Sequence, residues 1–251
     1  MPEYDPKHYY LHLTQYPYFD ALTTVRHFIQ EMTHYYFSHV QSAKNVDLFM
    51  LTSSVSSPME PGSNSEPITI AFGGHNTHLV DSSQFGFEPL LFQGTDMTYC
   101  YLPSMRGENP DNRHLNQFYH CECEMVGSME DVIMVVEDYF RHLCSIMLSI
   151  SPVTNRISNN PNETRTVLTQ IVQLGSFPRI SLSDAADLLA NEPNAIELLR
   201  NTPHGKDITT KGELALSTFI GNGAPFWITH YDRDNVPFYQ KPSPSNPDTV
   251  E

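Results

Sequence analysis

The segment MRGENPDNRHLNQFYHCECEM, residues 105–125, contains a turn followed by a strand pattern. Residues 109–112 are Asn, Pro, Asp and Asn, which favour turns. From residue 116 onward, polar residues alternate with apolar or small ones, and this alternation is typical of a β-strand. Residues 97–102, MTYCYL, are also strand-like. We therefore expect the two strands to form a hairpin with a long connecting loop.

The cations of this segment gather around the turn. Arg106 precedes the turn, and Arg113 and His114 follow it, in a chain whose 14 Lys and Arg face 29 Asp and Glu. Arginine presents a planar fork of donors that suits phosphate oxygens. Phe118 is placed to stack under a flat base, and Glu108 to accept from an exocyclic amine. These residue types predict either a nucleotide site without a glycine-rich phosphate loop or a charged hairpin tip over a packed aromatic ring.

The composition indicates one large domain or two small ones. The chain has 251 residues, of which 39% are hydrophobic and 11% aromatic, enough for a sizeable core. Its formal net charge of −15 argues against a surface that mainly holds nucleic acid, because phosphate backbones need clustered Lys and Arg. The sequence has no signal-peptide pattern and no apolar run of transmembrane length, so we expect no membrane partner.

The cysteines indicate a reducing compartment. Cys121 and Cys123 are two positions apart, so they share one face of a strand and cannot easily bond to each other. With Cys100 and Cys144 they are expected to be free thiols in a cytoplasmic protein. His120 lies on the other strand face and no second cysteine pair exists, so we predict no metal-binding side chains here.

Hydrophobic periodicity predicts two long helices, at 19–42 and 129–149. The apolar stripe of the first recurs at steps of three and four: Leu22, Val25, Ile29, Met32, Tyr36 and Val40.

Two shorter helices are expected in the second half of the chain. One lies near 181–191, with Ser181 or Ser183 as its cap, and the other near 210–219, with a capping box that starts at Thr210.

The remaining elements are expected to be short strands and loops. Strands are predicted at 46–52, 68–72, 77–81, 97–102, 116–126 and 225–231. A turn is predicted at FGGHNTH (72–78), a polar loop at 151–163, an irregular lead-in strand or arm at 1–17, and a frayed end at 241–251, while 84–93 is ambiguous between helix and strand. Helices mixed with hairpins favour an α+β fold, an antiparallel sheet flanked by helices.

The order of the residues around the turn resembles motif 2 of the class II aminoacyl-tRNA synthetases. MRGE, a short loop, RHLNQF and a strand ending in ECEM are similar to the pattern of the aspartyl and asparaginyl group, which is F-R-A-E, a loop, R-H-L-x-E-F and a strand with two acids. Met105, Gly107 and Gln117 depart from that pattern, whereas Arg, Glu, Arg-His-Leu and Phe are kept in order. The resemblance is closest to asparaginyl-tRNA synthetase and the related archaeal asparagine synthetase.

Most of the chain shares the resemblance. Residues 19–62 resemble motif 1 and the loop after it, and VDSSQFGFEPLL (80–91) resembles the family's S-x-Q-L amino-acid loop. A helical segment at 163–219 follows the motif 2 region at 97–126, and PFWITHYDRDNVPFYQK (225–241) looks like the strand that ends in P-F-Y near the substrate.

The resemblance implies roles for the nucleotide residues. Arg106 would hold the α-phosphate of ATP and stabilise charge as the adenylate forms, which makes it the expected catalytic residue. Arg113 and His114 would bind the outer phosphates, and Glu108 and Phe118 would take the adenine.

It also implies an amino-acid site. Ser83 and Gln84 match the amino-acid loop, and Glu122 matches the strand acid that faces the substrate side chain in the asparaginyl branch. Glu60 matches the acid that receives the substrate ammonium, although Pro61 disturbs that alignment. Phe87 stands where the aspartyl branch has the lysine that pairs with aspartate, so asparagine is favoured over aspartate. The alternative is that Phe87 is simply a core residue.

Two parts of the family pattern have no counterpart in the sequence. Only 18 residues precede the helix at 19–42, too few for the anticodon-binding barrel, so we expect a short N-terminal arm at 1–18 and a catalytic domain at 19–251. Motif 3, which carries another ATP-binding arginine, would follow the P-F-Y segment, so we expect a C-terminally incomplete core.

The function implied is activation of asparagine or aspartate by ATP, with Mg²⁺ as cofactor. The alternatives are an asparagine synthetase that works through an aspartyl-adenylate, and an inactive paralogue or fragment that only binds ligand or partner. The resemblance also implies a homodimer through the helix at 19–42 and the strand at 46–52. The net charge and the short N-terminal arm do not support tRNA as an autonomous partner.

Overall fold

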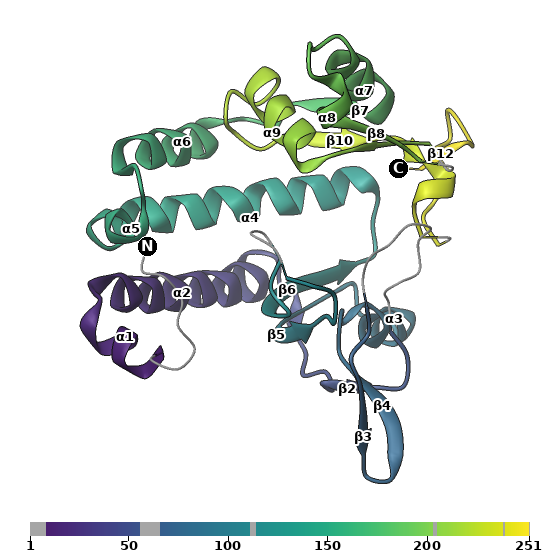
Figure 1. The fold of residues 1–251 in the computed structure, drawn as a ribbon. Coiled ribbons are helices and arrows are strands. Elements are labelled where there is room, and N and C mark those ends of the chain that lie inside the picture. Colours follow the sequence, from purple (N-terminus) through teal and green to yellow (C-terminus); the bar gives the residue numbers. More distant parts are fainter. Residues whose placement is uncertain (1–8, 56–65, 111–113, 203–204, 238, 251) are drawn as a thin grey trace. The chain divides into compact units, whose positions relative to one another are not determined.

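The computed structural model describes residues 9–55, 66–110, 114–202, 205–237 and 239–250 (Figure 1). The chain divides into two compact units. Unit 1 combines residues 1–42 with 130–176, and unit 2 combines residues 43–129 with 177–251. Each unit therefore contains two separate stretches of the chain.

Unit 1 is helical. Helix α2 carries aliphatic and aromatic side chains at steps of three and four, and α4 has the same pattern with Glu130 and Asp131 in its first turn, where acids favour the helix dipole. The elements of unit 1 are α1 (Tyr9–Gln15), α2 (Pro17–Tyr35), the π-helical turn η1 (Tyr36–Val40), α4 (Met129–Ser149), α5 (Ser151–Ile157) and α6 (Pro161–Gln173).

Helices α2 and α4 are joined by buried polar contacts around an aromatic cluster. The hydroxyl groups of Thr33 and Tyr139 are 2.6 Å apart, and the Tyr36 hydroxyl donates to the carbonyl oxygen of Val135 at 2.8 Å. Gln41 in turn donates to the Tyr36 hydroxyl at 2.7 Å. Tyr36 is fully buried and its polar group is satisfied, so this contact fixes the packing of the two helices.

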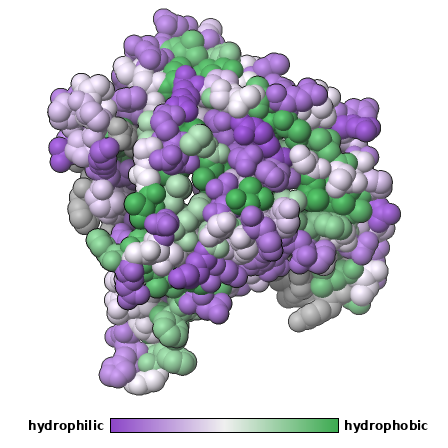
Figure 2. Space-filling model, turned by 180° about the vertical axis from the view of Figure 1, so that it is seen from behind, coloured by the Kyte–Doolittle hydropathy of each residue, from purple (hydrophilic) through white to green (hydrophobic). Residues whose placement is uncertain are grey.

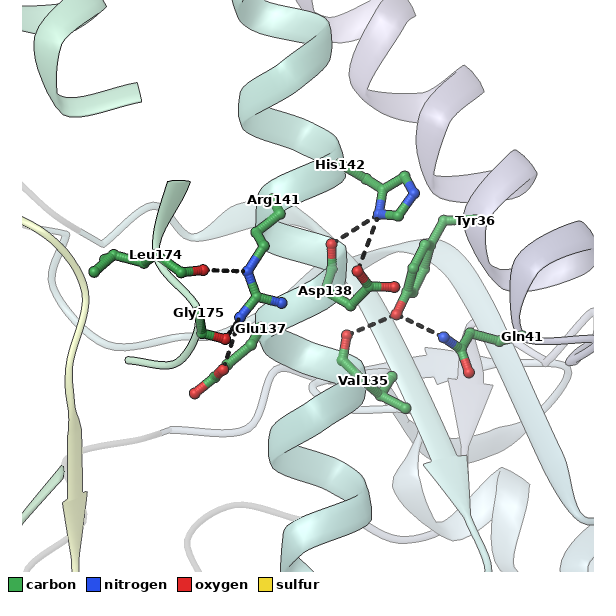
Figure 3. Close-up of polar contacts among 9 residues, drawn as sticks. All are labelled: Tyr36, Gln41, Val135, Glu137, Asp138, Arg141, His142, Leu174 and Gly175. Atoms are coloured by element: carbon green, nitrogen blue, oxygen red, sulfur yellow. Dashed lines mark hydrogen bonds and ion pairs between the residues drawn. The ribbon is translucent and has the colours of Figure 1, made fainter. Parts of the chain in front are cut away.

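Arg141 ties α4 to the end of α6 (Figure 3). Its guanidinium group donates to the carbonyl oxygens of Leu174 at 2.9 Å and Gly175 at 2.7 Å, and to the carboxylate of Glu137 at 3.0 Å. Glu137 is 4% exposed, so the ion pair is largely removed from water. The next residue of α4, His142, has its Nδ1 2.9 Å from the carbonyl oxygen of Asp138 and 3.6 Å from the Asp138 carboxylate.

Unit 2 is built around the hairpin of β5 (Met97–Met105) and β6 (Gln117–Met125). The register pairs Met97 with Met125 and Met105 with Gln117, and the short strand β1 (Lys44–Asn45) adds to β5 in parallel. Nine residues on each strand take part, which makes this the longest ladder among the described residues.

Unit 2 also contains a second small sheet and a helix, whose residues precede this hairpin in the sequence. Strands β2 (Leu51–Thr52), β4 (His75–Leu79) and β3 (Thr69–Phe72) form it in that order, and α3 (Gln84–Phe92) follows. Gly73 and Gly74 turn β3 into β4 with φ angles of 59° and 83°, a conformation that suits a tight hairpin turn. The main chain then links the sheets, since the N–H of Met105 donates to the carbonyl oxygen of Val80 at 2.8 Å.

The C-terminal stretch of unit 2 has its own apolar core. Strand β7 (Arg179–Ser181) pairs in parallel with β10 (Trp227–Thr229), and Ala185, Leu189, Leu198 and Leu216 are buried together behind them. The other elements here are α7 (Leu182–Ala190), α8 (Ala195–Leu198), β8 (Leu199–Thr202), β9 (Gly205–Ile208), α9 (Thr210–Phe219), β11 (Tyr231–Asp232), the 3₁₀ turn η2 (Arg233–Asn235) and β12 (Thr249–Val250).

The α+β prediction is confirmed, and so are both long helices and the central hairpin. The sheet is not one continuous antiparallel sheet: the described strands form small separate sheets, and two of the pairings, β1 with β5 and β7 with β10, are parallel.

Several local predictions are wrong. Residues 9–15 form a helix rather than an irregular arm, and the polar loop predicted at 151–163 is largely helical, because prolines at the first turns of α5 and α6 start helices there. The strand predicted at 46–52 is reduced to residues 51–52. The predicted frayed end pairs instead as β12 with β11.

The N-cap residues predicted from the sequence can be compared with those of α7 and α9. Ser181 caps α7 as predicted, since its hydroxyl oxygen accepts from the N–H of Asp184. Helix α9 is capped by Thr209 rather than Thr210, and the Thr209 hydroxyl accepts from the N–H of Gly212. Gly212 stands at the third helical position, so the predicted capping box of Thr210 and Glu213 does not form. The ambiguous segment at 84–93 is the helix α3.

Part of the apolar stripe of α2 is buried and part is exposed. Val25 and Tyr36 are buried within unit 1, where α2 packs against α5 and is bonded to α4, both of them helices. Val40, at the end of the stripe, is 43% exposed.

Apolar side chains also reach the surface singly. Phe49, Phe92 and Ile196 are each about nine-tenths exposed, at 89%, 90% and 92%. On the face seen from behind, hydrophobic residues are scattered among hydrophilic ones (Figure 2). Within the described part of the chain, no helix has both the length and the apolar character needed to cross a membrane.

Candidate nucleotide and amino-acid site

One face of the β5–β6 hairpin carries three of the predicted site residues, Arg106, Phe118 and Glu122. Residues that alternate along a strand share a face, and directly opposed residues of an antiparallel pair share it too. The register opposes Ser104 to Phe118 and Cys100 to Glu122, so Arg106, which follows β5, continues the same alternation. The face therefore presents Phe118, His120, Glu122 and Glu124 in a row along β6.

Arg106 and Phe118 form the nucleotide end of this face. The guanidinium carbon of Arg106 lies 5.7 Å from the centre of the Phe118 ring, within the range of a cation–π contact. Nε of Arg106 is buried and has no hydrogen-bond partner among the described residues. A buried donor of this kind is costly when it is left unpaired, so it is suited to an anionic ligand.

The start of the turn is held by main-chain contacts. The N–H of Arg106 donates to the carbonyl oxygen of Asn116 at 2.9 Å, and the Asn116 side chain donates back to the carbonyl oxygens of Arg106 and Glu108. The N–H of Gly107 donates to the carbonyl oxygen of Glu66 at 2.7 Å, and the Glu108 carboxylate accepts from the N–H of Glu66 at 3.2 Å. The position of Arg106 is thereby fixed from both sides.

Glu122 is the amino-acid end of the face. Its Oε1 accepts from the Ser82 hydroxyl at 2.6 Å, and its Oε2 accepts from the N–H of Ser83 at 2.7 Å. The Ser82 hydroxyl oxygen accepts in turn from the N–H of Gln84 at 3.2 Å. The amino-acid loop is thus bonded directly to the strand acid that the resemblance pairs with it.

Ser83 and Gln84 differ in how they take part. Ser83 is 4% exposed, and its hydroxyl lies beside the thiol of Cys100, so only its main-chain N–H serves the Glu122 contact. Gln84 Oε1 accepts a hydrogen bond of 3.2 Å from the hydroxyl of Tyr239. Tyr239 belongs to the P-F-Y segment, so two segments that the resemblance places near the substrate are in contact in unit 2.

His120 lies between the two ends of the face. Its Nδ1 is 2.9 Å from the Ser104 hydroxyl and 3.5 Å from Oε1 of Glu122, and its ring meets that of Phe118 edge-on at 4.7 Å between centres. Burial lowers the pKa of His120 below its ordinary 6.5, and Arg106 lowers it further, while Glu122 and Asp81 oppose the shift. His120 is therefore neutral at neutral pH.

Glu124 ends the row. Burial raises its pKa from the ordinary 4.5 to about 7, and the neighbouring Glu88 and Glu122 carboxylates add to the shift. The far end of the face is thus rich in acids, and a neutral or cationic group is better accommodated there than a second carboxylate.

The structure brings together some of the predicted residues and not others. Arg106, Phe118 and Glu122 lie on one face, and Ser83 and Gln84 adjoin Glu122. His114 is described and exposed. Glu60 and Arg113 lie outside the described residues. Phe87 is fully buried in α3, as the core alternative expected.

Three members of the cluster were not picked out from the sequence as site residues. They are Ser82, Ser104 and His120. The strand alternation already placed His120 between Phe118 and Glu122, and that signal was sufficient to find it. Ser82 and Ser104 carry no comparable sequence signal, because their roles depend on the register of β5 and on the path of the loop after β4.

Among the residues that the structure describes, no group of three or more His, Cys, Asp or Glu side chains is close enough to hold a metal ion. His230 and Asp232, at the C-terminal end, line a surface pocket with Ser183 and Lys206 in unit 2.

The curated relatives include asparagine–tRNA ligases. A probable cytoplasmic asparagine–tRNA ligase of Encephalitozoon cuniculi is 26% identical and aligns with 67% of this chain and 36% of its own length. A mitochondrial asparagine–tRNA ligase of Saccharomyces cerevisiae is 25% identical and aligns with 93% of this chain and 51% of its own length. The chain thus spans roughly a third to a half of the length of these relatives.

Solved structures share the fold. Asparaginyl-tRNA synthetase from Pyrococcus horikoshii, complexed with asparaginyl-adenylate, superimposes with a TM-score of 0.82 at 22% identity, over 98% of this chain and 54% of that one. The Entamoeba histolytica enzyme, also with asparaginyl-adenylate, gives 0.75 at 19% identity, over 100% of this chain and 53% of that one.

The family model for class II tRNA synthetases (D, K and N) matches residues 3–251, almost the whole chain. This chain belongs to the class II tRNA synthetases of the D, K and N group.

Proposed function

We propose that this chain activates asparagine with ATP to form asparaginyl-adenylate. The observation that carries the proposal is the arrangement of one strand face, with Arg106 over Phe118 at one end and Glu122, held by the loop at Ser82 and Ser83, at the other. Phe118 and Glu122 are four positions apart on the strand, roughly 13 Å at the rise of a β-strand. That span suits a ligand with a base at one end and an amino-acid side chain at the other.

The chemistry needs no enzyme nucleophile. A carboxylate oxygen of the amino acid attacks the α-phosphorus of ATP, a P–O bond forms, and the bond to the bridging oxygen breaks so that pyrophosphate leaves with the electron pair. Arg106, whose buried Nε lacks a partner among the described residues, is placed to bind the α-phosphate and to stabilise the charge that develops. Family members use Mg²⁺ with ATP, where it would neutralise phosphate charge.

The choice of asparagine follows from local charge. Glu122 and Glu124 lie on one face of β6, with Glu88 nearby. Position 87, where the aspartyl branch has a lysine, is occupied here by the buried Phe87, so this lysine is absent from the acidic end of the face. An amide NH₂ can donate to the Glu122 carboxylate, whereas an aspartate side chain would place like charges together. The names and bound ligands of the compared synthetases support the same choice.

The expected location, oligomeric state and acceptor of this protein rest on its composition and on its family. We place the protein in the cytoplasm, as all four cysteines are free, and we expect a homodimer through α2 and the segment after it. For the compared ligases the acceptor named is tRNA. With a formal net charge of −15, we expect this chain to bind RNA weakly by itself.

Pyrophosphate exchange into ATP tests the proposal, with asparagine and aspartate supplied separately to the 251-residue chain. Exchange with asparagine alone is expected. Exchange with aspartate alone would instead support an asparagine synthetase that works through an aspartyl-adenylate. No exchange from folded protein would identify a chain that only binds a ligand or partner.

A further inference from the structure

The amide of asparagine needs two kinds of partner. Its NH₂ group donates, and its carbonyl oxygen accepts. Glu122 supplies an acceptor, but the donors closest to it, the Ser82 hydroxyl and the Ser83 N–H, are already directed at the Glu122 carboxylate. A pocket that reads a carboxamide through Glu122 alone would leave the carbonyl oxygen without a donor, which costs specificity.

His120 is the neighbouring side chain with a donor to offer. Ser104 is fully buried, and the partner that the structure gives its hydroxyl is Nδ1 of His120 at 2.9 Å. The donor and acceptor in this contact depend on the tautomer of His120, and in one arrangement the Ser104 hydroxyl donates to Nδ1. The neutral ring then carries its own proton on Nε2.

Nε2 is open to a ligand. The contacts of His120 with the described residues involve Nδ1 and the ring face, and within that part of the chain Nε2 has no hydrogen-bond partner. The His120 side chain is 26% exposed, between Phe118 and Glu122 on the strand. A donor at this point is adjacent to the acceptor on Glu122.

We propose that His120 is a specificity-determining residue, whose Nε2–H donates to the side-chain carbonyl oxygen of a bound carboxamide amino acid while Glu122 accepts from its NH₂ group. Ser104 acts through His120 and is a positioning residue, since its hydroxyl selects the tautomer. The inference rests on the proposed function for the identity of the ligand, and it extends that function by naming the group that reads the carbonyl oxygen.

The same geometry implies a pH-dependent choice of amino acid. The charged groups that face His120 are Arg106, Glu122 and Asp81. Protonation of His120 would add a positive charge beside the substrate side chain and thereby favour aspartate. The preference for asparagine over aspartate is therefore expected to fall as the pH drops through the pKa of His120.

The test compares His120→Leu, His120→Gln and a control, His78→Leu. His78 also pairs its Nδ1 with a hydroxyl on the adjacent strand, that of Thr69 at 3.1 Å, but it lies on β4 outside the site. Equilibrium dialysis measures the dissociation constants for labelled asparagine, aspartate and ATP, and pyrophosphate exchange is measured in parallel. Glutamine keeps an acceptor for Ser104 and a donor for the substrate.

His120→Leu is expected to weaken asparagine binding about tenfold to a hundredfold and to leave ATP binding within about twofold. His120→Gln should restore most of the affinity and remove the pH dependence of the asparagine-to-aspartate ratio, and His78→Leu should match the wild type. The inference is overturned if His120→Leu binds asparagine within twofold of the wild type, or if asparagine and ATP affinities fall equally and glutamine does not rescue them.

The two proposals fail differently. If the wild-type chain binds asparagine but does not exchange pyrophosphate into ATP, the proposed adenylation is contradicted. The asparagine dissociation constants of the His120 variants still test the role of His120 in that case. Wild-type chain that binds no asparagine overturns both. If His120→Leu does not fold, the pH dependence of selectivity in wild type and His120→Gln decides, and an equal dependence in both contradicts the inference.

Discussion

The main-chain N–H of Ser83 donates a hydrogen bond of 2.7 Å to Oε2 of Glu122, across 39 positions of sequence. This bond, with that of the Ser82 hydroxyl to Oε1, holds the carboxylate in one orientation on the strand face. Each carboxylate oxygen keeps lone-pair capacity for another donor. The acid is therefore both fixed by the protein and available to a ligand.

Replacement of this acid is expected to reduce the preference for asparagine. In Glu122→Gln, one oxygen becomes an NH₂ group that must face the Ser82 hydroxyl or the Ser83 N–H, and the charged acceptor for the substrate amide is lost. The asparagine KM in pyrophosphate exchange should rise about tenfold to a hundredfold, while the ATP KM changes little. Glu197→Gln is the matched control, because Glu197 is exposed and pairs with Lys211 on the surface. An unchanged asparagine KM would exclude the contact.

Removal of the Arg106 guanidinium is expected to slow adenylation itself. Arg106→Ala should lower kcat for exchange by about a hundredfold to a thousandfold, the range seen when one charge-stabilising donor is removed from an active site. Arg200→Ala provides the control, since Arg200 forms an exposed pair with Asp207 on the β8–β9 hairpin. Equal, small effects of the two substitutions would contradict the role given to Arg106.

The pKa of Glu124 predicts a pH dependence of stability. Its folded-state pKa of about 7 exceeds the ordinary 4.5, so between these values the folded chain binds a proton that the unfolded chain releases. Stability from this group is present below pH 4.5 and is lost as the pH rises toward 7. Glu124→Gln, which mimics the protonated form, should therefore match the wild type near pH 4.5 and exceed it in thermal midpoint at pH 8. A constant difference across this range would contradict the shift.

Arg141 is expected to be the more important arginine for the stability of unit 1. Arg141→Ala removes the donors to Leu174 and Gly175 and the ion pair with the buried Glu137 carboxylate (Figure 3). The loss should be about 2–4 kcal/mol of unfolding free energy, measured by urea denaturation. Arg156→Ala should cost less than about 1 kcal/mol, because the Arg156–Asp20 pair is exposed and 3.6 Å long. Equal losses would show that the Arg141 contacts add little.

The sequence predicted those elements whose signals are local. The periodicity of α4 and the alternation of β6 depend only on residues within each element, and both elements were located to within about a residue. The helices at 151–157 and 161–173 were missed because the polar Ser, Asn and Thr content of the segment suggested a loop. The pairing of β7 with β10 joins residues almost 50 positions apart, and no short pattern specifies such a contact.

The site was predictable as far as it lies on one strand. Phe118 and Glu122 follow from alternation, whereas the contacts of Ser82 with Glu122 and of Ser104 with His120 depend on how separate strands and loops meet. Ser83 lies beside Glu122, but it contacts that acid through its main-chain N–H, and its hydroxyl lies beside the thiol of Cys100. Side-chain identity alone could not separate these two roles.

The most direct test of adenylation is to capture its product. The chain is mixed with asparagine and ATP labelled at the α-phosphate, and the protein-bound nucleotide is separated after removal of free ligand. The account predicts labelled asparaginyl-adenylate bound to the wild-type chain and a strong loss of it in Arg106→Ala. Folded wild-type chain that retains only ATP, with no labelled adenylate in the presence of asparagine, would contradict the central claim.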